Sequence, residues 1–111
     1  MNTSQTASEQ IIEAVAAWPD VNVGPGKRGA SVAFRVGQRE IGHLHGNHAA
    51  HFNFQKTTWD DLRREGRIEP HPVFPDARGP AARRIESDAD VDDVIELLRL
   101  NYERMHVPEA A

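Results

Sequence analysis

The chain of 111 residues contains no cysteine. This absence excludes disulfide bonds, thiolate metal sites and thiol nucleophiles. The sequence also has no apolar run near the roughly 20 residues that a membrane span needs. Residues 1–6 lack the basic and apolar regions of a signal peptide. We therefore expect a soluble protein of the cytoplasm that does not interact with a membrane.

Positive charge is also scarce, because 13 lysines and arginines face 17 acidic residues and give a net charge of −4. Proteins that bind nucleic acid generally carry a basic field, since counterion release from phosphates drives their affinity. The balance disfavours nucleic acid as a partner. A local basic patch remains an alternative to an ordinary solvated surface, and the arginines that would form it are Arg63, Arg64, Arg67, Arg78, Arg83 and Arg84.

Familiar catalytic motifs are missing as well. No serine lies in a Gly-x-Ser-x-Gly turn, and there is no His-Glu-x-x-His pair. The glycines of residues 24–29 do not have the spacing of a phosphate-binding loop. The sequence therefore assigns no catalytic residue and no cofactor, and it leaves the oligomeric state open.

Two amphipathic helices are predicted near the ends of the chain. Thr6 and Glu9 have the spacing of a capping box, and Pro19 stops the helix that follows. The second helix begins at Ser87 or Asp88 and ends at Pro108. Its apolar stripe consists of Val91, Val94, Ile95, Leu97, Leu98, Tyr102 and Met105.

Alternating apolar residues between these helices predict strands over residues 21–23, 30–36 and 40–46, and a further one ending at Phe52–Phe54. A short helix is expected to start near Thr57 or Thr58 and to end before Gly66, followed by a weak strand over residues 81–85. The order α-β-β-β-α-β-α, with a possible fourth strand, predicts an α+β fold in one domain of residues 1–111, ordered over about 7–106. We expect a two-layer sandwich whose mostly antiparallel sheet carries both terminal helices on one face.

Gly37 and Gln38 are expected to form the turn of a hairpin, and that turn fixes a register. The predicted pairs are Val36 with Arg39, Arg35 with Glu40, Phe34 with Ile41, and Val32 with His43. Residues two apart on a strand share a face, so His43 and His45 point the same way. The register puts both on the apolar face, toward the helices.

Six histidines in so short a chain are the unusual chemical feature, and four of them lie within residues 43–51. We expect His43, His45 and the loop residue His71 to line a ligand pocket, with His48 and His51 in a turn and on the surface. Two imidazoles at this spacing can also reach one metal ion, with a third ligand from His48, His51 or His71. A metal-free organic ligand and a structural pair of half-buried histidines are the alternatives.

Several segments resemble the small bacterial and archaeal proteins known as luciferase-domain proteins, over roughly residues 10–105. They are residues 18–19, 29–35, 39–46, 69–76 and 97–104. The most specific are the Gly-His-Leu-His-Gly string of residues 42–46 and the Pro-His pair of residues 70–71. Light emission is what the family name implies, but the sequence has no flavin or nucleotide motif. Pro80 stands where the family pattern has an aromatic residue.

The order of elements is also similar to that of the MmcQ/YjbR proteins. That resemblance implies a frataxin-like, double-wing fold and a suggested role in DNA binding. The function expected from the residues is a ligand-binding or accessory domain whose pocket is lined by His43, His45 and His71. The alternatives are a metal-dependent enzyme that uses His43 and His45, and a nucleic-acid module that uses the arginines of residues 63–84.

Overall fold

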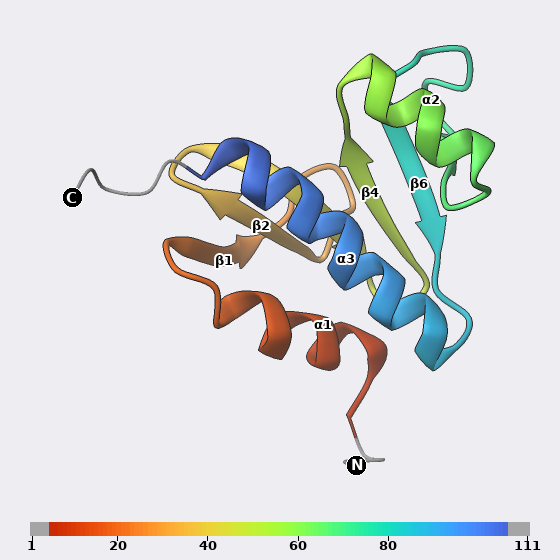
Figure 1. Cartoon of the computed structure of the whole chain (residues 1–111). Helices are drawn as coiled ribbons and strands as arrows, with labels where there is room; N and C mark the ends of the chain where they lie inside the picture. The colour runs from red at the N-terminus through yellow and green to blue at the C-terminus, as the bar shows by residue number, and fades with distance from the viewer. Residues whose placement is uncertain (1–4, 107–111) are drawn as a thin grey trace.

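The computed structural model describes residues 5–106 and contains three helices and six strands within them (Figure 1). In chain order the elements are α1 (Ala7–Ala16), β1 (Val21–Pro25), β2 (Val32–Val36), β3 (Arg39–His45), β4 (Ala49–Asn53), α2 (Lys56–Arg64), β5 (Glu69–Pro70), β6 (Pro80–Arg84) and α3 (Asp88–Met105). The predicted α+β class is confirmed. The short strand β5 was not predicted.

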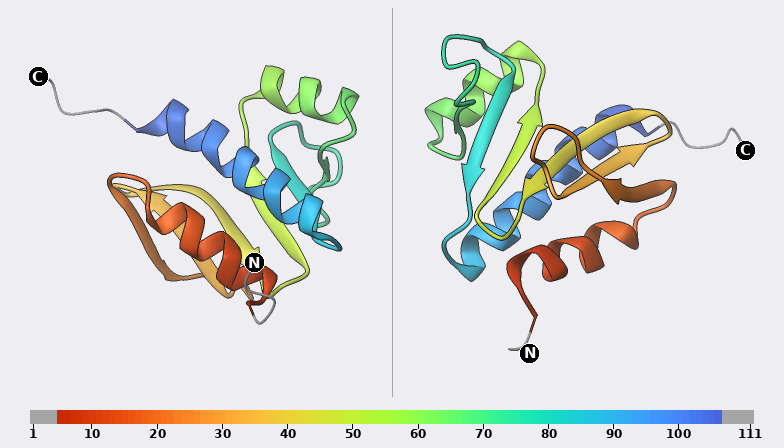
Figure 2. Two further views of the ribbon diagram at one scale, coloured as in Figure 1. Left: turned by 60° about the horizontal axis from the view of Figure 1, so that its bottom comes forward. Right: turned by 180° about the vertical axis from the view of Figure 1, so that it is seen from behind.

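The six strands form one antiparallel sheet in the order β1-β2-β3-β4-β6-β5. Helices α1 and α3 contact each other and lie on one face of this sheet, as predicted (Figure 1). The core lies between the two layers. Its largest fully buried side chains include Phe34, Ile11, Ile41, Leu44, Leu97 and Leu98. None of the three helices of residues 5–106 covers the opposite face of the sheet (Figure 2).

The predicted signals at the helix starts are confirmed for α1 and α3. Thr6 accepts a hydrogen bond from the Glu9 amide, and the Glu9 carboxylate accepts one from the Thr6 amide, which completes the capping box. Ser87 caps α3 by accepting from the Asp90 amide. Helix α3 ends at Met105, and Pro108, the residue expected to end it, lies outside the described residues.

The start of α2 differs from the prediction. The helix begins at Lys56, and Gln55 occupies the N-cap position without a side-chain hydrogen bond. Thr57 therefore lies inside the first turn instead of capping it. The predicted end is correct, since Gly66 follows the last turn with a φ of 73°, a left-handed conformation that glycine adopts without strain.

The predicted β2–β3 register is correct next to the turn and wrong beyond it. Val36 pairs with Arg39 and Arg35 with Glu40, but Phe34 pairs with Gly42 because a β-bulge makes Ile41 an extra residue. Beyond the bulge, Ala33 pairs with His43 and Val32 with Leu44. A bulge reverses the faces of the residues that follow it.

The bulge puts His43 and His45 on the face opposite the helices, which corrects their predicted orientation. Ile41 stays in the core, and Gly42 also faces α3. A Cβ on Gly42 would come within 2.5 Å of Leu98 Cδ2. The buried Asn101 of α3 donates from Nδ2 to the Ile41 carbonyl at 3.1 Å and to the Asn53 carbonyl at 3.2 Å. This asparagine therefore provides a partner for the carbonyl that the bulge takes out of the strand ladder.

Within residues 5–106, none of the helices combines the length and the apolar character needed to span a membrane. The longest helix, α3, is amphipathic, with its buried residues on the sheet side and charged residues on the other.

Candidate functional site

A pocket of about 370 Å³ lies on the sheet face opposite α1 and α3. Strands β3 and β4 supply its floor, and the β1–β2 and β5–β6 loops supply its walls. The sheet order places these two loops on opposite sides of the floor. The residues that line the pocket are Lys27, Arg28, Glu40, His43, His45, His51, His71, Val73 and Phe74.

Three of the four pocket histidines come from the floor. His43 lies directly opposite His51 in the β3–β4 register, and His45 is two residues further along β3. The Nε2 of His45 lies 3.1 Å from the Nδ1 of His51. One ring nitrogen from each of His43, His45 and His51 can be chosen so that all three lie within 4.8 Å of one another. The strand register thus brings three imidazoles to one point.

Glu40 orients the first of these rings. Its carboxylate lies 2.8 Å from Nδ1 of His43, and the hydrogen bond lowers the pKa of Glu40 below its ordinary value. A carboxylate that accepts from Nδ1 favours the tautomer in which Nε2 carries the lone pair. The ring of His43 is thereby prepared to offer Nε2.

His51 is the most perturbed group in the pocket. Burial lowers its pKa to about 4, and the positive charges that His45, His71 and His43 would carry add to the effect. Because its conjugate acid is disfavoured, His51 is neutral at pH 7. A neutral imidazole has the lone pair that a metal ion or a proton donor requires.

His71 reaches the pocket from the β5–β6 loop, with its ring centroid 4.3 Å from that of His51. The Val73 amide donates to Nδ1 of His71 at 3.1 Å. Burial, and then the charges of His43 and His45, lower the pKa of His71. Because Nδ1 of the neutral ring accepts the hydrogen bond from the Val73 amide, the proton of the ring is on Nε2. His71 therefore presents a hydrogen-bond donor to the pocket.

The structure brings together all three predicted site residues, His43, His45 and His71, in one pocket. It also adds His51, which the sequence placed on the surface. The signal that would have found His51 is a tight turn at residues 46–48, since that turn puts His51 opposite His43. His48 is exposed in this turn, as expected. His106, just after the end of α3, lies outside the pocket, where it stacks on Tyr102 and contacts Asp20.

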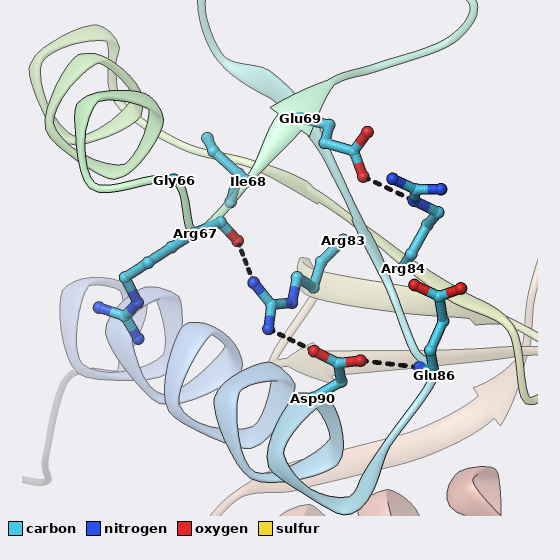
Figure 3. Close-up of a pocket in the computed structure, with 8 residues that line it drawn as sticks. All are labelled: Gly66, Arg67, Ile68, Glu69, Arg83, Arg84, Glu86 and Asp90. Carbon is cyan, nitrogen blue, oxygen red and sulfur yellow. Dashed lines mark hydrogen bonds and ion pairs between the residues drawn. The ribbon is translucent and has the colours of Figure 1, made fainter.

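A second polar pocket, of about 250 Å³, lies between the start of α3 and strands β5 and β6 (Figure 3). Arg83 projects across it and donates to the Arg67 carbonyl at 3.1 Å and to Asp90 at 2.6 Å. Arg84 pairs with Glu69, and Asp90 also accepts from the Glu86 amide. Most arginines of residues 63–84 therefore have a carboxylate partner: Arg64, Arg67, Arg78, Arg83 and Arg84.

The family model described as the luciferase domain matches residues 38–101. This segment covers more than half of the chain and contains Glu40 and all four pocket histidines. No curated protein and no solved structure matches the chain.

Proposed function

The chain belongs to the luciferase-domain family, and we propose that its histidine pocket binds one divalent transition-metal ion through His43, His45 and His51. Imidazole nitrogens suit zinc, copper, nickel and iron, and zinc is the ion we select for the test. The observation that carries the proposal is the convergence of three ring nitrogens within 4.8 Å. The protein would act as a metal-dependent binding domain.

The spacing of the ring nitrogens supports a metal site. Two imidazoles bound to zinc at about 2.0–2.1 Å with a tetrahedral angle have nitrogens roughly 3.3 Å apart. His45 Nε2 and His51 Nδ1 are 3.1 Å apart, close to that value. The widest separation among the three donors, up to 4.8 Å, would have to shorten by about 1.5 Å for all three to bind one ion in this geometry.

The tautomers divide the four histidines into two roles. His43 has Glu40 on Nδ1 and offers Nε2 to the ion, an arrangement typical of the outer shell of metal sites. Nδ1 of His71 accepts a hydrogen bond from the Val73 amide, so Nε2 carries the proton. We therefore assign His71 as a hydrogen-bond donor to whatever occupies the open side of the ion, not as a ligand.

Three protein ligands leave at least one coordination position open, as in zinc sites that bind a water or a substrate. That position faces a pocket large enough for a small molecule, since ligand pockets span about 300–1,000 Å³. A metal-free pocket for a small ligand is the second candidate, favoured by the apolar side chains of Val73 and Phe74 in its wall.

The test is a zinc titration of the full chain, produced without a histidine tag and stripped by a chelator. Isothermal titration calorimetry is expected to give one equivalent of zinc. His45→Ala and His51→Ala are each expected to weaken the zinc affinity by about 100-fold or more, because each removes a ligand. His71→Ala is expected to weaken it by less than about tenfold.

His48→Ala is the matched control, since His48 is an exposed histidine three residues from His51 and does not line the pocket. Its zinc affinity should equal that of the unmodified protein, and circular dichroism should show that every variant is folded. Absence of zinc binding by the unmodified chain would contradict the proposal, as would an equal loss of affinity in His48→Ala.

A further inference from the structure

One wall of the histidine pocket is cationic. Lys27 and Arg28 lie in the β1–β2 loop and line the pocket, and both side chains are exposed. Within residues 5–106 neither forms an ion pair with a carboxylate. The carboxylate in the same pocket, Glu40, is engaged by His43. This wall therefore offers positive charge that has no ion-pair partner among the described residues.

The loop that carries these cations is closely tied to the floor of the pocket. Ser31 donates its amide to the Leu44 carbonyl at 2.8 Å, and its hydroxyl accepts from the Gly46 amide at 3.0 Å. Gly26 packs so closely on Ala30 that a Cβ would lie 2.5 Å from it. Arg28 has a φ of 53°, a left-handed conformation that is unfavourable for arginine. The backbone thus holds the cationic wall in a defined place beside β3.

The facing wall is apolar. Val73 is 69% exposed and Phe74 is 51% exposed, and both line the pocket. The loop is closed by the Phe74 amide donating to the His71 carbonyl at 3.1 Å, and the Phe74 ring lies 5.3 Å from that of His71. Exposed apolar side chains that line a pocket with fixed polar groups are typical of a site for an organic ligand.

We infer that the pocket binds a small organic carboxylate with an apolar, ring-sized body. One carboxylate oxygen takes the open position of the metal ion, and the other interacts with Lys27 and Arg28. The apolar body contacts Val73 and Phe74. The inference rests on the proposed metal site, because the ion supplies the position that the carboxylate fills. The Nε2–H of His71 is a donor beside the same carboxylate.

Benzoate is the probe, titrated by calorimetry into the zinc-loaded full chain. Acetate has the carboxylate without the ring, and benzamide has the ring without the charge. Benzoate is expected to bind with at least about tenfold higher affinity than either control compound. Acetate lacks the ring that contacts the apolar wall, and benzamide lacks the charge that interacts with the cationic wall. A zinc titration in parallel reports on the metal site separately.

The charge variant is Lys27→Gln combined with Arg28→Asn, because asparagine tolerates the left-handed conformation at residue 28. We expect it to weaken benzoate binding by about tenfold while zinc affinity is unchanged. The matched control is Arg39→Gln with Lys56→Gln, which removes two exposed positive charges that do not line the pocket. It should leave benzoate affinity unchanged.

The outcomes separate the two proposals. Zinc binding with no benzoate binding, or with equal benzoate affinity in the Lys27/Arg28 variant and the unmodified chain, would overturn the carboxylate inference and leave the metal site in place. Failure of zinc to bind would overturn the metal site first, and the coordination of the carboxylate with it. Benzoate that binds only with zinc present, and more weakly in the charge variant, supports both.

Discussion

The histidine pocket and the arginine pocket beside α3 are built on opposite principles. In the pocket beside α3, arginines and carboxylates of the described residues neutralise one another, as Arg83 does with Asp90 (Figure 3) and also with Asp93. In the histidine pocket, like groups face one another, and Lys27 and Arg28 have no ion pair within residues 5–106. The arginine pocket thus pairs its charges, although the buried Nε of Arg83 has no hydrogen-bond partner within residues 5–106. The histidine pocket gathers imidazole nitrogens beside unpaired cations, an arrangement that is suited to a ligand.

This contrast predicts that the two pockets respond differently to substitution. Substitutions in the arginine pocket should change the free energy of unfolding and leave the metal affinity unchanged. Substitutions in the histidine pocket should change the metal affinity and leave the free energy of unfolding of the metal-free protein nearly unchanged. Arg83→Met, Glu40→Gln and Asp90→Asn test this difference, and Asn101→Leu tests the link between the helix layer and the histidine pocket.

Arg83→Met should have the largest effect on stability. The Arg83 side chain is only 20% exposed and pairs with Asp90 and Asp93, so its removal leaves two carboxylates short of a partner. We expect the free energy of unfolding to fall by about 2–3 kcal/mol, measured by urea denaturation, with zinc affinity unchanged. Arg64→Met is the control. Arg64 pairs with Asp61 on the exposed surface of α2, and its loss should cost less than about 0.5 kcal/mol.

Asn101→Leu should lower stability by about 1–3 kcal/mol, because the Ile41 carbonyl loses its buried donor, while the Asn53 carbonyl keeps its hydrogen bond from Arg104 Nη2 at 3.4 Å. This substitution tests the link between the helix layer and the pocket. Asn101 donates a hydrogen bond to Ile41, the extra residue of the bulge, and the bulge sets the sheet face on which His43 lies. Zinc affinity should therefore also fall by several-fold. Loss of stability with unchanged zinc affinity would show that the bulge does not need Asn101.

Glu40→Gln should act on the pocket alone. Removal of an outer-shell carboxylate typically weakens metal binding by 10–100-fold, and we expect about tenfold here, or about 1.4 kcal/mol. The denaturation midpoint of the metal-free protein should be nearly unchanged, since Glu40 is exposed. Glu69→Gln is the control, because Glu69 pairs with Arg84 outside the pocket. An equal loss of zinc affinity in both variants would contradict the assigned role of Glu40.

Acid titration should show the smallest effect. The hydrogen bond from the Glu86 amide, and then the charge of Arg83, lower the pKa of Asp90 in the folded protein below its ordinary value of 3.8. The unfolded chain therefore takes up this proton at a higher pH than the folded one. The stabilisation is fully present above about pH 3.8 and is lost as the pH falls through the folded pKa. Asp90→Asn should flatten the dependence of the denaturation midpoint on pH in this range.

The sequence predicted the elements whose signals are local. The capping box of Thr6 and Glu9, the Ser87 cap and the two apolar helix stripes are all read from residues a few positions apart, and the structure confirms them. The α+β class follows from their order. The two-residue strand β5 was missed because it contains a proline and depends on pairing with β6.

The orientation of the histidines could not be read in the same way. The alternation of residues 30–36 and 40–46 fits a hairpin without a bulge, and that register is right at Arg35 and Glu40. At this shift, Asn101 of α3 donates to the Ile41 carbonyl, and Leu98 lies where a Cβ on Gly42 would be. These residues are about 60 positions away in sequence, so the hairpin pattern alone carried no sign of the bulge, and the pairing of β3 with β4 brought in His51.

X-ray absorption spectroscopy of the zinc-loaded chain identifies the ligands of the ion itself. We expect three imidazole nitrogens at about 2.0–2.1 Å, with one or two further light ligands. His48→Ala and His71→Ala should retain this shell, and His51→Ala should lose one imidazole. A shell with fewer than two imidazoles in the unmodified chain, or one that is unchanged in His51→Ala, would contradict the proposed site.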